Sequence, residues 1–414
     1  WYTIDNFPSV SVNLSSIKDN LKALLVEATK ERLIADVKIA TSLSGGVDSS
    51  IIFSILNRIN KTNNKRSDLD LNPFILKYEE NQTFDDAIKL SDYFKRKPYV
   101  VGIDDSYTEN ITKNLSSIEL VESYFNQLEI YKAQKEKGFK ISIDGHGADE
   151  CLGGYDHDIQ YFGMHFQNSI VDLYNALKNT KGIDSLKSII KKHNFVEKLN
   201  KYDLNILKIF FEKKKINNNY VEADGINLIS PYLEEDMKKL QNYSFPLQIM
   251  FVRATYGNLQ WLLNKWDKAS MASSVEIRSP FMDWRFFQYA LALPAELKIQ
   301  HGQNKSILRD TFKDVLPDKL KLIKQGLPVV RKLIDEKNND LIKNVLNQKK
   351  FKETNIWESK NIIKDFNNPD FKSKKISQIS KIAFTYLLLE GFDNRKLDSS
   401  ISSQDVRESY NKLV

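Results

Sequence analysis

The sequence predicts an α/β protein in which a doubly wound parallel sheet is followed by a largely helical region. Between residues 37 and 143, short apolar and β-branched runs alternate with longer runs of helical spacing. This alternation is typical of parallel strands joined by helical crossovers. Beyond residue 155, apolar residues recur mainly at helical spacing. Because ligands of parallel sheets lie beyond the carboxyl ends of the strands, the loops after the strands are the first places to search for a site.

The predicted elements follow one another in a regular order. The chain opens with an irregular stretch and an amphipathic helix over about 14–33. Four strands are expected, at 37–43, 73–78, 98–103 and 139–143. Helices are expected between them, at about 51–59, 85–94 and 115–136. We also expect a helical insertion over about 156–260 and a helical C-terminal extension over 331–414.

The loop after the first strand has the composition of an anion-binding turn. It reads Ser44-Gly45-Gly46-Val47-Asp48-Ser49-Ser50. Its small residues leave backbone N–H groups accessible at the start of a helix, where the helix dipole also favours negative charge. An aspartate stands where a Walker-type loop has its lysine. We therefore interpret the anion as pyrophosphate and Asp48 as a ligand of an accompanying Mg²⁺; an ordinary capped turn is the alternative.

The loop after the fourth strand concentrates polar residues at a second strand end. It reads Asp144-Gly145-His146-Gly147-Ala148-Asp149-Glu150, followed by Gly153-Gly154-Tyr155. Two loops that follow strands of one parallel sheet meet at the same edge, so we expect both to contribute to one site. Taken alone, the second loop is equally compatible with a glycine-rich turn that ends in a capped helix.

Together these motifs resemble the asparagine synthetase family. The first loop is similar to the signature of the N-type ATP pyrophosphatases, which have an adenine nucleotide hydrolase-like fold and include GMP synthetases and tRNA-modifying enzymes. The second loop resembles the Ser-Gly-Glu-Gly-Ala-Asp-Glu segment of asparagine synthetases. A third stretch, 266–309, resembles their Asn-Ser-Met-Ala, Val-Glu-x-Arg-x-Pro-Phe-Leu-Asp and Lys-x-x-Leu-Arg segments. The resemblance implies an ATP-pyrophosphatase domain over 36–330, preceded by a linker and lead-in helix over 1–35.

The resemblance also implies a two-step reaction and a set of site residues. ATP would activate a carboxylate as an acyl-adenylate with release of pyrophosphate, and ammonia or an amine would then attack the acyl carbon. Asp48 and Asp149 would share Mg²⁺, and Lys305 would stabilise charge in both transition states. The positions that match ATP-contacting residues of the family are Leu43, Ser44, Gly45, Gly46, Val47, Asp48, Ser49, Ser50, Leu76, Asp144 and Gly145. Three more positions are assigned to substrate contact or to structural support: Tyr155, Glu276 and Arg278.

One catalytic position departs from the family. His146 stands where asparagine synthetases have a glutamate and the related β-lactam synthetases have a tyrosine. A histidine titrates near neutral pH and could take a proton from the incoming ammonium or amine; packing against the turn is the alternative. We therefore expect an ATP-dependent amide-forming ligase for a small-molecule or peptide carboxylate. Asparagine synthetase proper is the close second, and a tRNA-modifying ATPase is a more distant alternative.

Composition narrows the class of protein further. The chain has 414 residues, a net charge of +7 and one cysteine, Cys151, which excludes an internal disulfide framework. No apolar run approaches the ~20 residues that span a bilayer, so we expect a cytoplasmic protein without membrane contact. The basic residues are scattered, which argues against nucleic acid as a partner. The resemblance leaves room for an upstream glutamine-hydrolysing domain as the ammonia source, and for a homodimer.

Overall fold

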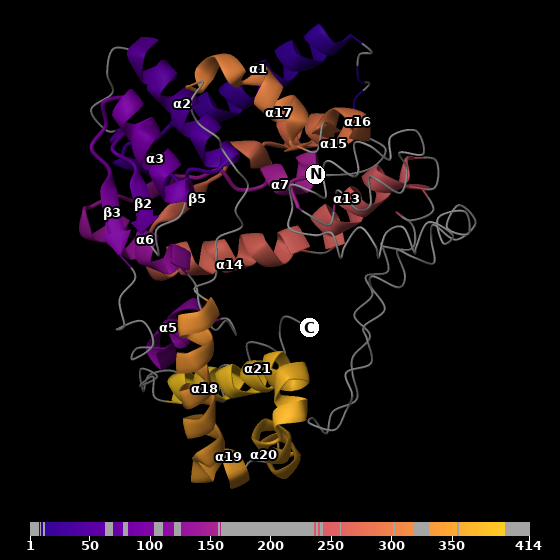
Figure 1. Ribbon diagram of the computed structural model, residues 1–414. Helices are drawn as coiled ribbons and strands as arrows, with labels where there is room; N and C mark the ends of the chain where they lie inside the picture. The colour runs from indigo at the N-terminus through magenta and orange to yellow at the C-terminus, as the bar shows by residue number, and fades with distance from the viewer. Residues whose placement is uncertain are drawn as a thin grey trace, which may run out of the picture. The chain divides into compact units, whose positions relative to one another are not determined.

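The computed structural model (Figure 1) describes residues 8, 10, 13–62, 69–77, 82–102, 111–119, 126–155, 158, 236, 239–240, 243–256, 258–300, 303–317, 331–353 and 356–393. The chain divides into two compact units, which are described separately below. The larger unit comprises 1–103, 126–216 and 224–328, and the smaller one comprises 104–125, 217–223 and 329–414. None of the helices in these described ranges is long and apolar enough to cross a membrane.

The larger unit is built on parallel strands, as the alternating pattern predicted. Its parallel strands are β1 Ile39–Thr41, β2 Phe74–Lys77, β3 Tyr99–Gly102, β4 Ile141–Ile143 and β5 Glu276–Arg278. Three of them pair in the order β1-β4-β5, and β2 pairs with β3. An isolated parallel bridge between Ser42 and Phe74 connects the end of β1 with the start of β2. The carboxyl ends of β1 and β4 are therefore neighbours, and the two glycine-containing loops leave the sheet side by side.

Helices surround these strands in the larger unit (Figure 1). They are α1 Leu14–Glu31, α2 Val47–Thr62, α3 Gln82–Tyr93, α6 Asn126–Glu136, α7 Ala148–Leu152, α13 Phe245–Tyr256, α14 Asn258–Ala272, α15 Trp284–Ala292, α16 Ala295–Lys298 and α17 Ser306–Thr311. A short antiparallel pair, β6 Ile299–Gln300 and β7 Gln303–Asn304, precedes α17. The mixed α/β class with parallel pairing is confirmed, and the doubly wound arrangement stays a prediction. Most of the predicted insertion over 156–260 lies outside the described residues, although α13 and the start of α14 are helical.

One apolar core holds the elements that carry the two loops. Leu21 of α1, Ile51 of α2, Ile143 of β4, Phe251 of α13 and Phe286 of α15 are all fully buried in it. Burying apolar surface of this size is the main source of folding free energy. Because α2 and β4 are fixed in the same core, the loops at their ends have little freedom to move apart.

The smaller unit is helical in its described part. Its helices are α5 Ile111–Ile118, α18 Arg331–Asn347, α19 Lys349–Glu353, α20 Ser359–Asn367 and α21 Pro369–Asp393. Leu115 of α5 is buried in one cluster with Ile342, Phe351 and Ile379. The stretch predicted to be mostly helical over 115–136 contains the end of α5 and all of α6, and the two helices belong to different units, α5 to the smaller and α6 to the larger. Apolar periodicity alone does not show which core a helix enters.

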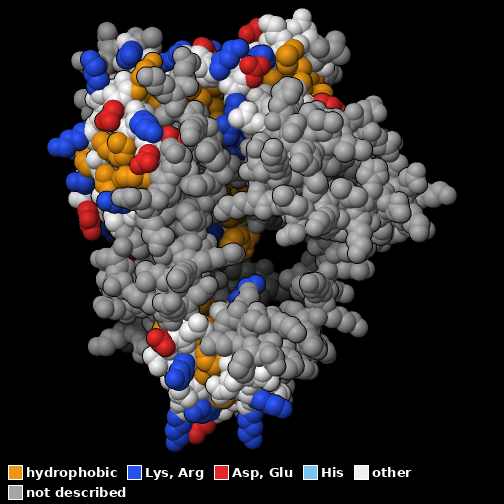
Figure 2. All heavy atoms as spheres, viewed as in Figure 1, with side chains coloured by type: hydrophobic (Ala, Val, Ile, Leu, Met, Phe, Trp, Pro, Cys, Tyr) orange, Lys and Arg blue, Asp and Glu red, His pale blue; other side chains and the backbone are white. Residues whose placement is uncertain are grey.

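Charged side chains of both signs share the described surface of the larger unit. Figure 2 shows Lys and Arg side chains interspersed with acidic and apolar ones on the face that it displays. Several basic side chains are paired, as in the ion pair of 2.8 Å between Lys22 and Asp314 and that of 2.8 Å between Lys132 and Glu129. Exposed pairs of this kind contribute little to stability, so they indicate a solvated surface.

Candidate active site

The first loop is a compact turn that serine hydroxyls hold in shape. It leaves β1 through the buried Leu43 and enters α2, whose first turn contains Asp48. The Ser49 hydroxyl accepts a hydrogen bond of 3.1 Å from the backbone N–H of Ser44 and lies 2.9 Å from the Ser44 hydroxyl. Gly45 has φ +76°, and a Cβ on it would lie 1.8 Å from the carbonyl oxygen of Thr83. Only glycine fits there, and the result is a tight turn at a helix N-terminus that suits an anion.

The remaining residues of this loop differ in what they can offer a ligand. Ser44 is exposed and Gly46 is partly exposed, whereas the side chains of Val47 and Ser50 are buried. The Gly46 N–H donates a hydrogen bond of 3.3 Å to the Ser44 hydroxyl. A bound anion would therefore meet mainly backbone groups and the exposed serine at this turn, while Val47 anchors the helix.

The second loop packs directly against the first. It leaves β4 at Ile143, passes through Gly147 with φ +99° and continues into α7. A Cβ on Gly145 would lie 2.8 Å from the backbone nitrogen of Ser49. The two loops thus touch backbone to backbone, and a glycine at position 145 is what permits the contact.

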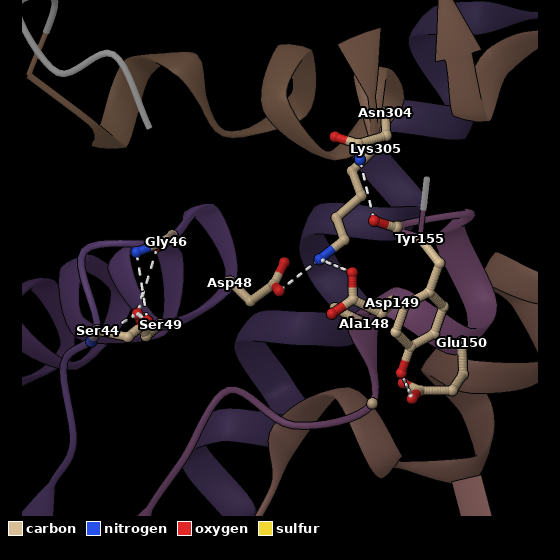
Figure 3. A network of polar contacts seen from close by, with 12 residues as sticks. Ser44, Gly46, Asp48, Ser49, Ala148, Asp149, Glu150, Tyr155, Asn304 and Lys305 are labelled. Carbon is tan, nitrogen blue, oxygen red and sulfur yellow. Dashed lines mark hydrogen bonds and ion pairs between the residues drawn. The ribbon is translucent and has the colours of Figure 1, made fainter. Parts of the chain in front are cut away.

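Lys305 joins the two loops through their carboxylates (Figure 3). Its ammonium group donates a hydrogen bond to Asp48 and forms an ion pair of 2.8 Å with Asp149. Burial disfavours the charged ammonium, but the carboxylates of Asp149 and Asp48 outweigh that cost and raise the pKa of Lys305. The charge of this lysine is therefore maintained at physiological pH.

The backbone around Lys305 positions its side chain. Lys305 has φ +54°, in the left-handed region, immediately before α17. The neighbouring Asn304 is buried, and its side-chain amide donates a hydrogen bond of 2.9 Å to the carbonyl oxygen of Gly154. A Cβ on Gly154 would lie 1.7 Å from Asp149 Oδ1 and 2.3 Å from Lys305 Cε. Position 154 must therefore be glycine for the ion pair between Lys305 and Asp149 to form.

The two aspartates fit a magnesium ion that is also held by a nucleotide. Asp48 and Asp149 lie close enough to share one ammonium group, and both offer the oxygen atoms that Mg²⁺ prefers. Among the described residues, no group of three or more His, Cys, Asp or Glu side chains could hold a metal alone. Mg²⁺ commonly takes only one or two carboxylates and completes its shell with phosphates and water. The donor set is therefore suited to a metal–nucleotide complex.

Asp144 is part of an interior hydrogen-bond network. Its carboxylate is 4% exposed and accepts hydrogen bonds of 2.6 Å from Ser142 and 2.9 Å from Tyr131. His146 Nε2 lies 3.4 Å from the same carboxylate. Burial would raise the pKa of Asp144, but interactions with His146, Ser142 and Tyr131 outweigh burial and lower it. Its side chain is thus committed to supporting the loop, and its backbone N–H donates a hydrogen bond of 3.0 Å to the carbonyl oxygen of Arg278.

His146 contacts α14 through its ring. Its ring stacks on Trp266 of α14, with the ring centroids 3.7 Å apart and the planes 17° apart. The side chain is 18% exposed. The structure therefore brings His146 together with Asp144 and Trp266, and Trp266 is a neighbour that the sequence motifs did not identify.

The other predicted positions lie in β2, directly after α7 and in β5. Leu76 is buried in β2. The Tyr155 hydroxyl donates a hydrogen bond to the buried Glu150, and burial together with Asp149 raises the pKa of that glutamate. Glu276 of β5 forms an ion pair of 2.8 Å with Arg278. None of these contacts involves the ammonium group of Lys305 directly, so they support the site from its edges.

Sequence reasoning missed several supporting residues because they act across large sequence separations. Gly154 was noted only as part of a motif, and Asn304 and Tyr131 were not identified at all. The signal for Asn304 is its position directly before Lys305. Nothing in the pattern around Tyr131 distinguishes it from a core aromatic residue of α6.

Comparison with known proteins places these motifs in a family. A family model described as asparagine synthase matches residues 20–388. The chain is 24% identical over 392 residues to glutamine-hydrolysing asparagine synthetase 1 of Bacillus subtilis, covering 83% of this chain and 54% of that protein. It is 24% identical over 330 residues to the glutamine-hydrolysing asparagine synthetase of Gallus gallus, covering 75% and 42%. It is 23% identical over 358 residues to the amidase chry2 of Gibberella zeae, covering 76% and 52%. The chain spans about half the length of the curated relatives it matches.

Proposed function

Because the chain belongs to the asparagine synthase family, we propose that it is an ATP-dependent ligase that forms an amide. It activates a carboxylate as an acyl-adenylate, releases pyrophosphate and transfers the acyl group to ammonia or an amine. The observation that carries this proposal is the contact of Lys305 with both Asp48 and Asp149. Through it, a fixed positive charge and two metal-binding carboxylates meet where the two loops touch.

ATP is assigned to the first loop and the adjoining strand ends. The pyrophosphate part would lie against the backbone of Ser44–Ser50 at the start of α2, where helix N–H groups favour anions. Leu43, Leu76, Asp144 and Gly145 would border the adenosine. Asp48 and Asp149 would hold Mg²⁺, which, when bound, neutralises charge on the polyphosphate.

In the first step, a carboxylate oxygen of the substrate attacks the α-phosphorus of ATP. The bond between that phosphorus and the pyrophosphate oxygen breaks, and AMP is left attached to the acyl group. Two anions approach each other here, so positioning and positive charge are the main requirements. Lys305 supplies the positive charge, because Asp149 and Asp48 keep its ammonium group charged. Its contacts with these two carboxylates also fix its position.

In the second step, the nitrogen nucleophile attacks the acyl carbon, and the bond from carbon to the AMP oxygen breaks. The nitrogen must lose protons as the amide forms, and His146 is the proposed acceptor. Support for this role comes from its position one residue after Gly145, which contacts the first loop. The neighbouring Asp144 carboxylate, 3.4 Å from His146 Nε2, would stabilise the imidazolium that forms.

Asparagine synthetase proper is the second candidate, and the names of the relatives favour it. Two of the relatives above are named glutamine-hydrolysing asparagine synthetases, whereas the third is named an amidase. His146 in place of the family glutamate favours a different substrate. The asparagine synthase match reaches residue 388, far beyond the two loops, which argues against a tRNA-modifying enzyme.

Product analysis tests the proposal. Mg-ATP is incubated with aspartate plus ammonium, with other carboxylates plus ammonium, and with no acceptor, and nucleotides are separated by chromatography. AMP and asparagine formed from aspartate would identify asparagine synthetase proper. AMP formed only with other carboxylates would support the specialised ligase. A protein that releases ADP in place of AMP with every acceptor would contradict the adenylation chemistry.

Two substitutions make the test specific to the site. Asp48→Asn and Lys305→Met are each expected to lower the rate of AMP formation about 100-fold or more, because each removes a charge placed for the transition state. Lys313→Met is the matched control, since Lys313 is a 76% exposed lysine of the same segment. Normal turnover in either site variant would rule out the assigned roles.

A further inference from the structure

A cavity of about 610 Å³ adjoins the second loop on the side of His146. It lies among the end of α1, the middle of α14 and the chain around β5. By the same measure of volume, one water molecule needs about 10–15 Å³, and ammonia is of similar size. The cavity is therefore far larger than a passage for ammonia alone requires.

The walls of the cavity combine an apolar, partly aromatic side with charged side chains. Leu263, Trp266 and Met282 line it together with the stacked imidazole of His146. A Cβ on Gly147 would lie 2.4 Å from Met282 Sδ, so the loop that carries His146 is packed tightly against this wall. His146 is thus shared between the cavity and the loop that contacts the ATP-binding turn.

Most charged side chains around the cavity are already paired with one another. Arg32 pairs with Asp283 at 3.1 Å, and Arg278 pairs with Glu276 at 2.8 Å. Glu31 also has a partner, Arg285. Asp267 of α14 lines the cavity as well, and no cation of the described residues lies within ion-pair distance of it. The cavity consequently combines an aromatic wall with the exposed carboxylate of Asp267, which pairs with no cation in the described part of the chain.

We propose that this cavity binds the nitrogen donor as a primary organic ammonium ion, with Asp267 pairing with its charge and Trp266 contacting its carbon chain. A carboxylate stabilises the ammonium charge, and an indole ring offers apolar surface to the carbon chain. The inference rests on the proposed function and names the class of nucleophile used there. During amide formation the nitrogen gives up two protons, one to His146 and one to water, as the C–N bond forms and the C–O bond to AMP breaks.

Binding of a small amine to the full chain tests this proposal. The protein is labelled with ¹⁵N at its tryptophan indoles, and the Trp266 signal is identified by its loss in Trp266→Phe. The probes are n-butylammonium, n-butyrate, n-butanol and ammonium, each added to saturation. We expect a saturable shift of the Trp266 signal with n-butylammonium, and at least about tenfold weaker binding of ammonium. No saturable shift is expected with n-butyrate or n-butanol.

Substitution of the carboxylate completes the test. Asp267→Asn should weaken n-butylammonium binding about tenfold or more, whereas Asp92→Asn, at an exposed aspartate of α3, should leave it unchanged. Unchanged binding to Asp267→Asn, an unmoved Trp266 signal or equal binding of n-butyrate would overturn the inference. Mg-ATP binding is measured separately by calorimetry. Failure to bind Mg-ATP by a protein that binds the amine would count against the proposed function and not against the cavity.

Discussion

At the scale of single residues, Gly154 determines whether the central ion pairs can form. Lys305 is buried between Asp48 and Asp149, and the space its side chain occupies exists because position 154 has no side chain. The atoms nearest to an added methyl group are Asp149 Oδ1, Lys305 Cε and Asp149 Cγ, all of them in the side chains of the ion pair. The fold can therefore absorb the change while the geometry of the site cannot.

Gly154→Ala is expected to reduce AMP formation about 100-fold, since transition-state stabilisation depends on placing the charge correctly. The melting temperature should change by no more than a few degrees, because the three atoms nearest to the added methyl group all belong to side chains. Gly102→Ala is the control, as a Cβ there would meet nothing within 4 Å. Comparable activity of the two variants would show that the ion pairs do not depend on position 154.

Much of this constellation could be predicted from the sequence, and the limits of prediction have a physical cause. Asp48, Asp149 and Lys305 belong to three separate motifs, and the structure brings them together in one cluster. Trp266 was not predicted as a neighbour of His146, because stacking between residues 120 positions apart depends on how α14 packs. Local patterns identify chemistry, whereas tertiary packing decides which groups touch.

At the scale of elements, Lys298 connects α16 with the end of α15. Its side chain is 1% exposed, and Nζ donates a hydrogen bond of 2.8 Å to the carbonyl oxygen of Leu291. That carbonyl belongs to the last turn of α15, where helix carbonyls lack partners within the helix. Burial lowers the pKa of Lys298 from 10.5 to about 7, although nearby Cys151, Asp158 and Glu296 oppose the change. Folding thus favours the neutral amine.

This shift predicts how stability depends on pH. Between about pH 7 and 10.5 the unfolded chain holds a proton on Lys298 that the folded chain has lost, so stability rises with pH in this window. Lys298→Met removes the penalty, which is about 1.4 kcal/mol per pKa unit, but also loses one hydrogen bond. We expect the variant to be about 3 kcal/mol more stable at pH 7, with the difference shrinking toward pH 10.5.

Urea unfolding of both proteins at several pH values measures this difference. Lys349→Met, at an 86% exposed lysine, should follow the wild-type profile. If the free energy of unfolding depended on pH in the same way in the wild type and in Lys298→Met, the folded protein would keep Lys298 charged.

Elements were predictable where the apolar pattern was long enough. The alternation of strands and helices over 37–143 identified β1 to β4, although β1 is shorter than the predicted 37–43. β5 was missed, because a three-residue strand with Glu276 and Arg278 at its ends has no distinctive apolar pattern. Parallel pairing with β4 holds these three residues in an extended strand, although their sequence alone does not favour one.

At the scale of the whole molecule, the chain divides its apolar residues between separate cores. Leu25, Ile51 and Phe286 belong to the core of the larger unit, and Phe351 and Ile379 belong to that of the smaller one. The smaller unit is formed by chain segments far apart in sequence, since it includes 104–125 as well as 329–414. The sequence suggested a contiguous C-terminal extension over 331–414. The smaller unit also contains α5, which lies far earlier in the sequence.

Leu115→Ala tests whether α5 is needed by the smaller unit. Leu115 is 1% exposed and packs with Ile342 and Phe351, so its truncation should cost the smaller unit about 2–5 kcal/mol. Hydrogen exchange followed by mass spectrometry should show faster exchange in α18–α21, with α2 and α7 unchanged and Mg-ATP still bound. Ile51→Ala, in the other core, should give the reverse pattern. Equal loss of protection in both units after either substitution would show that the two cores unfold together, in which case the two glycine-containing loops depend on the stability of the smaller unit as well.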